Sequence, residues 1–375
     1  MGDVGGRGLT ELKLLVGADD FWRHAAADCA SASRRLFVQA MTFEGDTAGQ
    51  SVARAIGASS ARDRRVLVDA YSSVVISDRW VGWPPAWLKP DLCRELTATR
   101  AMFRELIDGG APVRVTNPFA PLMVNYPARN HKKLIVADDV VYLGGINFSD
   151  HNFAWRDFML RLEGPQVADF AAADFEASWN GMSRADARDL DGLRLLSLDG
   201  RDNHAFFDEL SRLLAGARRE IVVMSAYLTF PFTALLAEAA RRGVAVSLIT
   251  PWANNKPIVR DYLLDYARRH AFNVRLLADM SHLKGILIDG EALVVGSCNF
   301  DFVGLAAEEE LIAIVRSPAL IADFRRLVID PALAVAGEAR PIPPMAGLFA
   351  NAVLRMGELG ARAMRRARRT AVDWT

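Results

Sequence analysis

The sequence has little cysteine and no excess of positive charge, the features on which disulfide frameworks, cysteine metal centres and nucleic-acid binding depend. Its 375 residues include only three cysteines, Cys29, Cys93 and Cys298, whose spacing matches neither a disulfide pattern nor a metal-ligand motif. This cysteine usage is typical of a protein in a reducing compartment. The 45 basic residues are balanced by 45 acidic ones, so no overall positive field favours nucleic acid as a partner.

Several kinds of targeting and cofactor segment are also missing. The longest uncharged run, residues 221–237, contains Pro231 and several hydroxyl side chains, so it predicts a strand, a loop and a helix start rather than a membrane span. The N-terminus lacks the basic region and apolar core of a secretory signal, and there is no Gly-rich nucleotide loop of the Walker type. We therefore expect no transmembrane helix, no metal and no other cofactor.

One phrase, His-x-Lys-x4-Asp, occurs twice in a chain that has only six histidines and six lysines. A random His-x-Lys is expected about 0.1 times in a sequence of this composition, so two copies with matched flanks indicate a functional pattern. Arginine supplies nearly all the other positive charge, which makes lysine a specific choice at both places. The two copies are His131, Lys133 and Asp138, and His282, Lys284 and Asp289.

Each copy is followed by the pattern of a β-hairpin. Apolar runs flank the turn signals Asp138-Asp139 and Asp289-Gly290, and a Gly-rich turn ending in Asn147 or Asn299 closes each phrase. His and Lys two residues apart on a strand share a face, and the return strand brings the Asn back beside them. The Asp of each copy lies near the turn, at the far end of the hairpin. We interpret it as holding the hairpin rather than taking part in chemistry.

The similarity between the halves extends beyond these phrases. Residues 157–165 align with 310–318, 36–39 with 221–224, and 66–68 with 244–246. Strands, helices and a hairpin therefore recur in the same order, which predicts a duplicated α/β unit with enough apolar residues, 51%, for two cores. We expect a first half over residues 1–195 with its motif at 131–147, a second half over 196–335 with its motif at 282–299, and a tail over 336–375.

This pattern resembles the phospholipase D superfamily, whose signature is the repeated His-x-Lys-x4-Asp motif, and is most similar to bacterial cardiolipin synthases. The resemblance extends from about residue 14 to residue 330. It implies an α/β fold of two sandwich halves related by a pseudo-two-fold axis, with both motifs meeting at one central site. The first half departs by a longer excursion at residues 72–130 and by Gly145 at the place of Ser297. Ser297, Gly145 and Gly296 are candidate substrate-binding positions.

Two histidines across one phosphate allow a two-step displacement through a phosphohistidine. The resemblance implies that His131 is the nucleophile and His282 the general acid and base, a choice that the symmetry of the sequence alone leaves open. The two lysines and two asparagines are suited to the non-bridging phosphate oxygens.

Asp157 and Glu310 follow the two motifs at similar offsets and could orient the histidines. Related enzymes imply that this pairing crosses between the halves, Glu310 with His131 and Asp157 with His282. For the other histidines, His24, His151, His204 and His270, we expect surface or structural roles. The candidate catalytic residues are His131, Lys133, Asp138, Asn147, Asp157, His282, Lys284, Asp289, Asn299 and Glu310.

The favoured function is transfer of a phosphatidyl group from a phospholipid such as phosphatidylglycerol to the hydroxyl of a second lipid. This exchanges one phosphodiester for another, so no nucleotide is required. The alternatives are a hydrolase of the phospholipase D type, a nucleic-acid phosphodiesterase, which the neutral net charge disfavours, and a lipid-binding protein without activity. Intact motifs disfavour the last of these.

Two segments could contact a membrane surface. Trp80, Trp83 and Trp87 lie in a Pro-rich loop, where the alternative is packing onto the domain. The tail beyond Pro344 predicts a helix with an apolar stripe and basic flanks, suited to anionic lipid, where the alternative is a terminal helix docked on the body. We expect a protein of the cytoplasm that is peripheral on the inner face of the cell membrane. The stripe is Leu348, Phe349, Ala352, Val353, Met356, Leu359 and Ala363, and the basic residues are Arg355, Arg362, Arg365, Arg366, Arg368 and Arg369.

Overall fold

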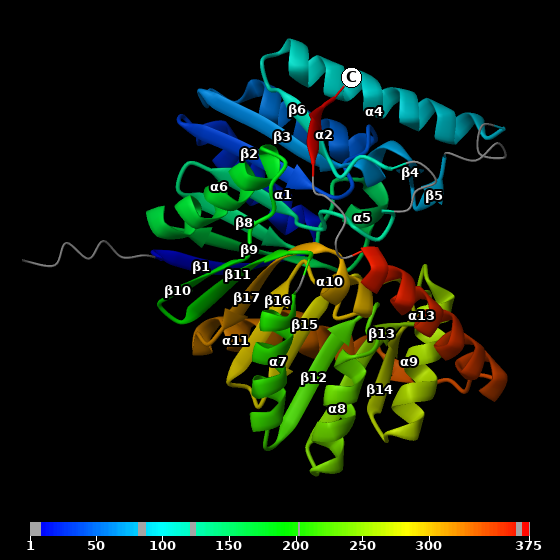
Figure 1. Ribbon diagram of the computed structural model, residues 1–375. Helices are drawn as coiled ribbons and strands as arrows, with labels where there is room; N and C mark the ends of the chain where they lie inside the picture. The colour runs from blue at the N-terminus through cyan, green and yellow to red at the C-terminus, as the bar shows by residue number, and fades with distance from the viewer. Residues whose placement is uncertain (1–8, 82–87, 121–124, 202, 365–369, 375) are drawn as a thin grey trace, which may run out of the picture. The chain divides into compact units, whose positions relative to one another are not determined.

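The computed structural model describes residues 9–81, 88–120, 125–201, 203–364 and 370–374, and for residues 363 and 364 it describes the backbone alone. The chain folds as two compact units, each built on one large mixed sheet with helices packed against it (Figure 1). The first unit contains Met1–Ala154, Phe158–Arg184 and Arg368–Thr375, and the second contains Trp155–Asp157 and Ala185–Ala367.

The sheet of the first unit has eight strands. Its middle strands β2, β3 and β6 run parallel, and every other neighbouring pair is antiparallel. Strands such as β7 are buried along their whole length because helices cover the sheet, which explains their continuous apolar sequence. The strand order is β1 (Glu11–Val16), β9 (Phe158–Glu163), β8 (Val140–Gly144), β7 (Leu134–Ala137), β2 (Arg35–Ala40), β3 (Asp63–Asp69), β6 (Val113–Thr116) and β19 (Ala371–Asp373).

The sheet of the second unit repeats this arrangement and adds one edge strand, β10. From β11 to β18 every neighbouring pair has the same sense as its counterpart from β1 to β19. The duplicated α/β unit predicted from the sequence is therefore confirmed. The strand order is β10 (Asp186–Leu190), β11 (Leu193–Asp199), β17 (Glu309–Val315), β16 (Ala292–Gly296), β15 (Lys284–Ile288), β12 (Glu220–Ser225), β13 (Ala245–Pro251), β14 (Asn273–Leu277) and β18 (Gly337–Glu338).

Helices connect the strands, and several begin at side-chain caps. Asp46 caps α2 by accepting the N–H of Gly49 at 3.0 Å, and Asp301 caps α10 by accepting the N–H of Gly304 at 2.8 Å. The first unit contains α1 (Ala18–Ser31), α2 (Thr47–Ala58), α4 (Pro90–Asp108), α5 (Asp150–Ala154) and α6 (Pro165–Trp179). The second contains α7 (His204–Gly216), α8 (Phe232–Arg241), α9 (Pro257–Arg269), α10 (Phe302–Ala306), α11 (Pro318–Phe324), a π-helical turn (Arg325–Ile329), α12 (Asp330–Val335) and α13 (Pro344–Met364).

The excursion at residues 72–130 of the first half adds a small hairpin to that unit and also contains β6, the strand that corresponds to β14. It includes most of a 3-10 turn (Ala70–Ser73), the small hairpin β4 (Val75–Ile76) and β5 (Arg79–Trp80), helix α4 and strand β6. Trp80 packs within this segment, with its ring 6.2 Å from those of Phe119 and Tyr126. Trp83 and Trp87 lie outside the described residues.

The tail helix α13 has two different faces. Ala350, Leu354 and Ala361 are buried, and the helix packs on α9 and α10. On another face Leu348, Phe349, Met356 and Leu359 are 59–69% exposed. The alternatives predicted for the tail were a helix docked on the body and a helix in contact with a membrane surface. The helix docks through a face that includes small residues, and it also exposes an apolar stripe. The arginines at 365, 366, 368 and 369 and the side chain of Ala363 lie outside the description.

No helix among the described residues combines the length and the apolar character required to cross a bilayer.

The turn of each motif hairpin is anchored by its aspartate. Asp138, with φ 51°, accepts the backbone N–H groups of Ser33, Arg34 and Arg35 at 2.8–3.0 Å. Burial alone would raise the pKa of Asp138, but these three donors lower it to about 2. The carboxylate thus joins the turn to the start of β2, as the sequence predicts.

Asp289 makes the corresponding contacts in the second unit. It accepts the N–H groups of Arg218, Arg219 and Glu220 at 2.8–2.9 Å, and these donors lower its pKa although burial opposes them. The same anchor therefore holds both hairpins.

Replacing Asp138 with Ala should lower the free energy of unfolding by about 2 kcal/mol, because three charge-assisted hydrogen bonds are lost. Urea denaturation at pH 7 measures this. The folded pKa lies below the unfolded value of 3.8, so the contribution is present above about pH 4 and is lost as the pH falls toward 2. The difference between wild type and Asp138→Asn should accordingly shrink between pH 6 and pH 3. A difference that is unchanged at pH 3 would contradict the anchoring role of the charge.

Candidate functional site

The first motif lies at the open end of the hairpin formed by β7 and β8. His131 and Lys133 come just before β7, not within it, and both are buried. The ammonium of Lys133 donates to the backbone oxygen of His131 at 2.5 Å. Asn147, beyond the end of β8, accepts the N–H of Thr42 at 3.1 Å through its side-chain oxygen and donates to Asn152 Oδ1 at 3.5 Å. The hairpin thus gathers the three motif side chains at one end.

A buried ion pair positions the segment that enters the first motif. Asp69, at the end of β3, accepts Nη1 of Arg129 at 3.0 Å and the backbone N–H of Asn130 at 2.8 Å. Asn130 in turn accepts from Gln39 Nε2 at 2.7 Å. Because a buried carboxylate without its partner is costly, this pair fixes the backbone next to His131. No local pattern signals this pair, because its members lie 60 residues apart.

The second motif is built in the same way. Lys284 is the first residue of β15, and its ammonium donates to the backbone oxygen of His282 at 2.8 Å. Both side chains are buried. Burial lowers the pKa of Lys284 to about 8, although the carboxylates of Asp157 and Glu310 oppose this shift. The lysine is therefore a cation whose charge depends on nearby carboxylates.

His282 is oriented by a carboxylate that precedes it by 125 residues. Its Nδ1 lies 2.8 Å from Oδ2 of Asp157, and its backbone N–H donates to the oxygen of Arg156 at 2.8 Å. Residues 155–157 follow the first motif in the sequence but belong to the second unit. An ionised carboxylate can only accept, so this contact places a proton on Nδ1 of His282 and orients the ring so that chemistry would use Nε2. The pairing of Asp157 with His282 is the one that the resemblance implies.

Aromatic rings and a third lysine surround His282. The rings of Trp155 and Tyr227 lie 5.4 and 5.9 Å from its imidazole, and the ammonium of Lys256 lies 4.5 Å from the centre of the Tyr227 ring. Lys256 and Trp155 are site residues that the sequence analysis missed. The scarcity of lysine was the one signal that could have singled out Lys256.

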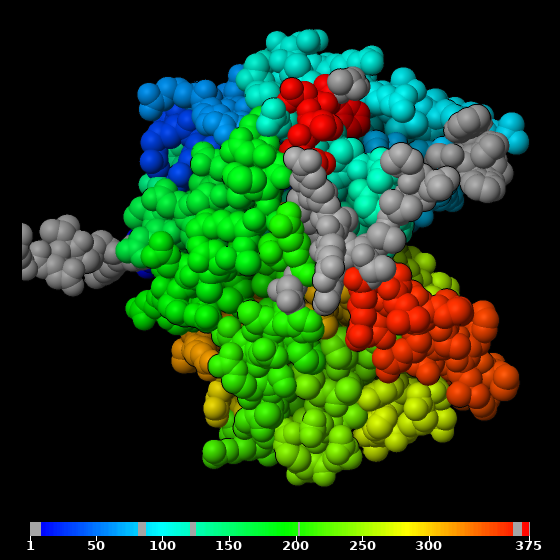
Figure 2. Space-filling view, viewed as in Figure 1, coloured from blue at the N-terminus to red at the C-terminus, as the bar shows by residue number. Residues whose placement is uncertain are grey.

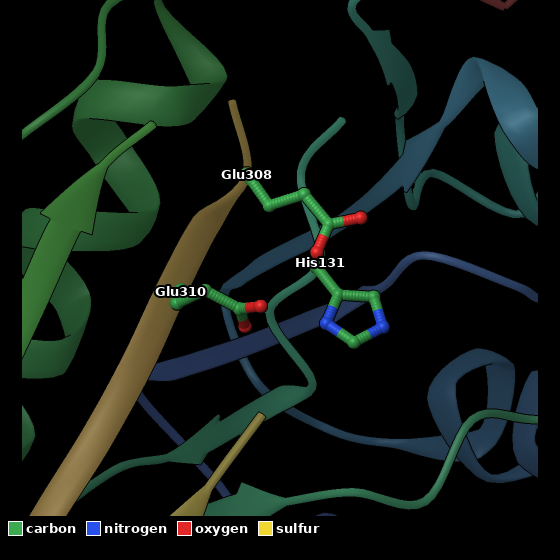
Figure 3. Close-up of side chains that lie close together, drawn as sticks. All are labelled: His131, Glu308 and Glu310. Atoms are coloured by element: carbon green, nitrogen blue, oxygen red, sulfur yellow. The ribbon is translucent and has the colours of Figure 1, made fainter. Parts of the chain in front are cut away.

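Glu310 lies on β17 beside the closing turn of the second motif, and Glu308 directly precedes the strand (Figure 3). Within the second unit Glu310 accepts the hydroxyl of Ser297, whose Oγ also accepts the N–H of Leu311 at 3.0 Å. The hydroxyl of Ser297 is thus used to join β16 and β17. Figure 3 also draws His131, which belongs to the other unit, and its pairing with Glu310 stays a prediction.

The glycines of the closing turns allow close approach of neighbouring strands. Gly296 has φ 148°, and a Cβ there would lie 2.3 Å from the oxygen of Leu311. Gly145 donates its N–H to the oxygen of Phe158 at 3.3 Å. Asn299 is 5% exposed, and its Oδ1 has no hydrogen-bond partner among the described residues. Among the described residues this buried oxygen therefore remains an acceptor without a donor.

The four histidines outside the motifs lie at different places in the fold. His24 contacts Lys13 Nζ at 2.9 Å, and His270 stacks on Tyr266 with ring centres 4.3 Å apart. His204 begins α7. His151 bonds with Ser149 Oγ at 3.0 Å and Asn152 Nδ2 at 2.8 Å, beside Asn147.

The charge of Lys284 provides a test of this geometry. The protein has six lysines, so ¹³C-labelled lysine gives a resolvable NMR spectrum in which Lys284 should titrate near pH 8. Asp157→Asn removes a carboxylate that favours the ammonium, so the midpoint of Lys284 should fall. Lys256→Ala removes a like charge, so the midpoint should rise. Shifts of the same sign in both variants would contradict the placement of these groups.

Known proteins resemble the chain in sequence and in fold. Cardiolipin synthase B of Salmonella typhi is 27% identical over 342 residues, covering 80% of this chain and 75% of that protein. Cardiolipin synthase B of Escherichia coli K12 is 27% identical over 347 residues, covering 81% and 76%. Among solved structures, the phosphatidylserine synthase of Haemophilus influenzae Rd KW20 has a TM-score of 0.70 at 14% identity, covering 97% of this chain and 96% of that one. This likeness shows the fold.

A family comparison covers more than half of the sequence. Residues 27–179 and 210–328 match the family described as cardiolipin synthase, PLD-like domain, and these segments include both His-x-Lys-x4-Asp motifs. The chain therefore belongs to the phospholipase D-like family of the cardiolipin synthases and is a phosphatidyltransferase of that kind.

Proposed function

We propose that the protein is a transphosphatidylase that transfers the phosphatidyl group of phosphatidylglycerol to the glycerol hydroxyl of a second lipid. The observation that carries the proposal is the oriented imidazole of His282, held by Asp157 at 2.8 Å within a duplicated motif. Its relatives named cardiolipin synthase B support the same substrate class.

In the first step, a nitrogen of His131 attacks phosphorus. The bond from phosphorus to the leaving glycerol oxygen breaks, and His282, entering the step as imidazolium, gives that oxygen its Nε2 proton and becomes neutral. In the second step, His282 removes the proton from the hydroxyl of the acceptor lipid. The resulting oxygen attacks phosphorus, and the bond to His131 breaks. One phosphodiester replaces another, and each proton is returned.

The other motif residues stabilise charge or hold the frame. Lys133 and Lys284 each donate to the backbone oxygen of their own histidine, which holds an ammonium at the backbone of each motif. Such cations suit the negative charge that develops on the non-bridging oxygens, and Asn147 and Asn299 add neutral donors. Asp157 fixes the tautomer of His282, and Asp138 and Asp289 anchor the hairpins.

Lipid products measured by mass spectrometry test the proposal. Wild-type protein incubated with phosphatidylglycerol vesicles should form cardiolipin. His131→Ala and His282→Ala should abolish detectable formation, and Asp157→Asn should lower kcat by about 10²–10⁴-fold, because general acid and base catalysis contributes on that scale.

His24→Ala is the matched control, because His24 is a histidine outside both motifs, and it should retain wild-type activity. Phosphatidic acid in place of cardiolipin would indicate a hydrolase. Turnover that survives both motif substitutions, or no lipid product from wild type, would contradict the proposal.

The exposed stripe of α13 supports a place at the membrane surface. Figure 2 shows the residues of α13, in orange and red, on the surface of the second unit. Met345, Leu348, Phe349, Met356 and Leu359 are 59–72% exposed. The exposed Arg355 and Arg362 flank the stripe, and exposed apolar residues with basic neighbours favour an anionic lipid interface. These features support the proposal that the protein is peripheral on the inner face of the cell membrane.

Substitution within the stripe tests this surface better than truncation, since removing α13 would also uncover its buried face. Phe349→Ser combined with Leu359→Ser should weaken binding to vesicles containing phosphatidylglycerol at least about 10-fold, which corresponds to about 1.4 kcal/mol of lost apolar transfer. Sedimentation with vesicles measures it. Met182→Ser, at a 58% exposed site in the first unit, is the control. Equal binding of the double variant and the wild type would rule out α13 as the contact.

A further inference from the structure

Three carboxylates converge in the first unit, away from the motif histidines. Glu44 follows β2, Asp46 caps α2, and Glu95 lies on α4. One carboxylate oxygen from each lies within 4.8 Å of those of the other two. Glu44 is fully buried, and the other two are partly buried. Elements from three parts of the sequence thus bring three acidic groups to one place.

The hydrogen bonds of these groups leave one buried oxygen without a donor. Asp46 Oδ1 accepts the N–H of Gly49 at 3.0 Å, and Glu95 accepts the hydroxyl of Ser77 at 3.1 and 3.2 Å. Glu44 Oε2 accepts the N–H of Ser77 at 3.2 Å, whereas Glu44 Oε1 has no hydrogen-bond partner among the described residues. This oxygen is therefore a buried acceptor that a cation could ligate.

Within the described part of the chain, no lysine or arginine forms an ion pair with any of the three carboxylates. These two residue types therefore leave the negative charge of the cluster unbalanced. His151 lies beside the cluster, with Nδ1 3.8 Å from Glu44 Oε2, and its ring nitrogens also contact Ser149 Oγ at 3.0 Å and Asn152 Nδ2 at 2.8 Å.

The chemistry of the donors suits a hard cation. Ca²⁺ takes oxygen ligands at about 2.3–2.6 Å in flexible geometry, whereas Mg²⁺ demands near-octahedral geometry at about 2.1 Å. All three side chains of the cluster offer carboxylate oxygen, and the more tolerant Ca²⁺ is the cation to test. Carboxylates that share a site repel one another, and burial raises the pKa of Glu44 to about 9, with Glu95 adding to it. A divalent cation would relieve that repulsion.

We propose that Glu44, Asp46 and Glu95 form a binding site for a hard divalent cation of the Ca²⁺ type. The site is structural, because the proposed phosphoryl transfer needs no metal. It joins α2 and α4 to the segment after β2.

The cation would act on the first motif through the backbone. The N–H of Glu44 donates to the oxygen of Phe148 at 3.0 Å, and the N–H of Thr42 donates to Asn147 Oδ1 at 3.1 Å. Ordering residues 42–46 therefore orders the closing turn that carries Asn147.

Thermal unfolding of chelator-treated, full-length protein tests the site without relying on activity. Wild type should melt at least about 3 °C higher in 5 mM CaCl₂ than in NaCl of equal ionic strength, because a ligand of the folded state stabilises it. Titration calorimetry should show one Ca²⁺ per chain.

Glu44→Gln and Glu95→Gln should lose most of the Ca²⁺ shift, yet melt no lower than wild type without Ca²⁺ because repulsion is relieved. This second expectation separates loss of a ligand from loss of the fold. Asp189→Asn removes an acid that is paired with Arg194 in the second unit, and it should keep the full shift. Wild type without a Ca²⁺ shift, or equal shifts in all variants, would overturn the proposal.

Discussion

The two motif hairpins are the constraint on which the rest of the molecule depends. Each hairpin lies inside its sheet, between the antiparallel and the parallel strands, so its register sets the position of everything around it. At one end an aspartate accepts three backbone N–H groups of the segment entering β2 or β12. At the other end the lysine turns back onto the oxygen of its histidine. A slip of one residue would therefore undo the anchor and the site together.

The hairpins, the duplication and the structural role of the aspartates were predictable because each depends on local pattern. Apolar runs separated by a turn specify a hairpin whatever lies around it. The link between Asp157 and His282 was predictable only through the resemblance to a family, since nothing local connects residues 125 positions apart. The buried pair of Asp69 and Arg129 could not be predicted. Its members are ordinary charged residues until the fold removes them from water.

The sequence pattern of the tail predicted the exposed apolar face of α13 but not the face that packs on the body. Large apolar residues at helical spacing predicted the stripe of α13, and four of them, Leu348, Phe349, Met356 and Leu359, are indeed on its surface. The docking face is formed instead by small residues such as Ala350 and Gly347, where a Cβ on Gly347 would lie 2.5 Å from Cβ of Asp265. Gly weakens an isolated helix, yet here it allows close packing on α9. Helix propensity alone therefore disfavours glycine at position 347, where the packing of α13 on α9 requires it.

The last strand of each sheet has a consequence for how the chain tolerates shortening. Strand β18, at residues 337–338, covers the outer edge of β14, and β19, at residues 371–373, covers the outer edge of β6. Both short strands come from the final 40 residues, so one stretch of chain closes corresponding edges of two sheets. Uncovered strand edges are templates for intermolecular pairing. The C-terminal stretch thus protects both copies of the repeat against aggregation, a task that neither copy performs for itself.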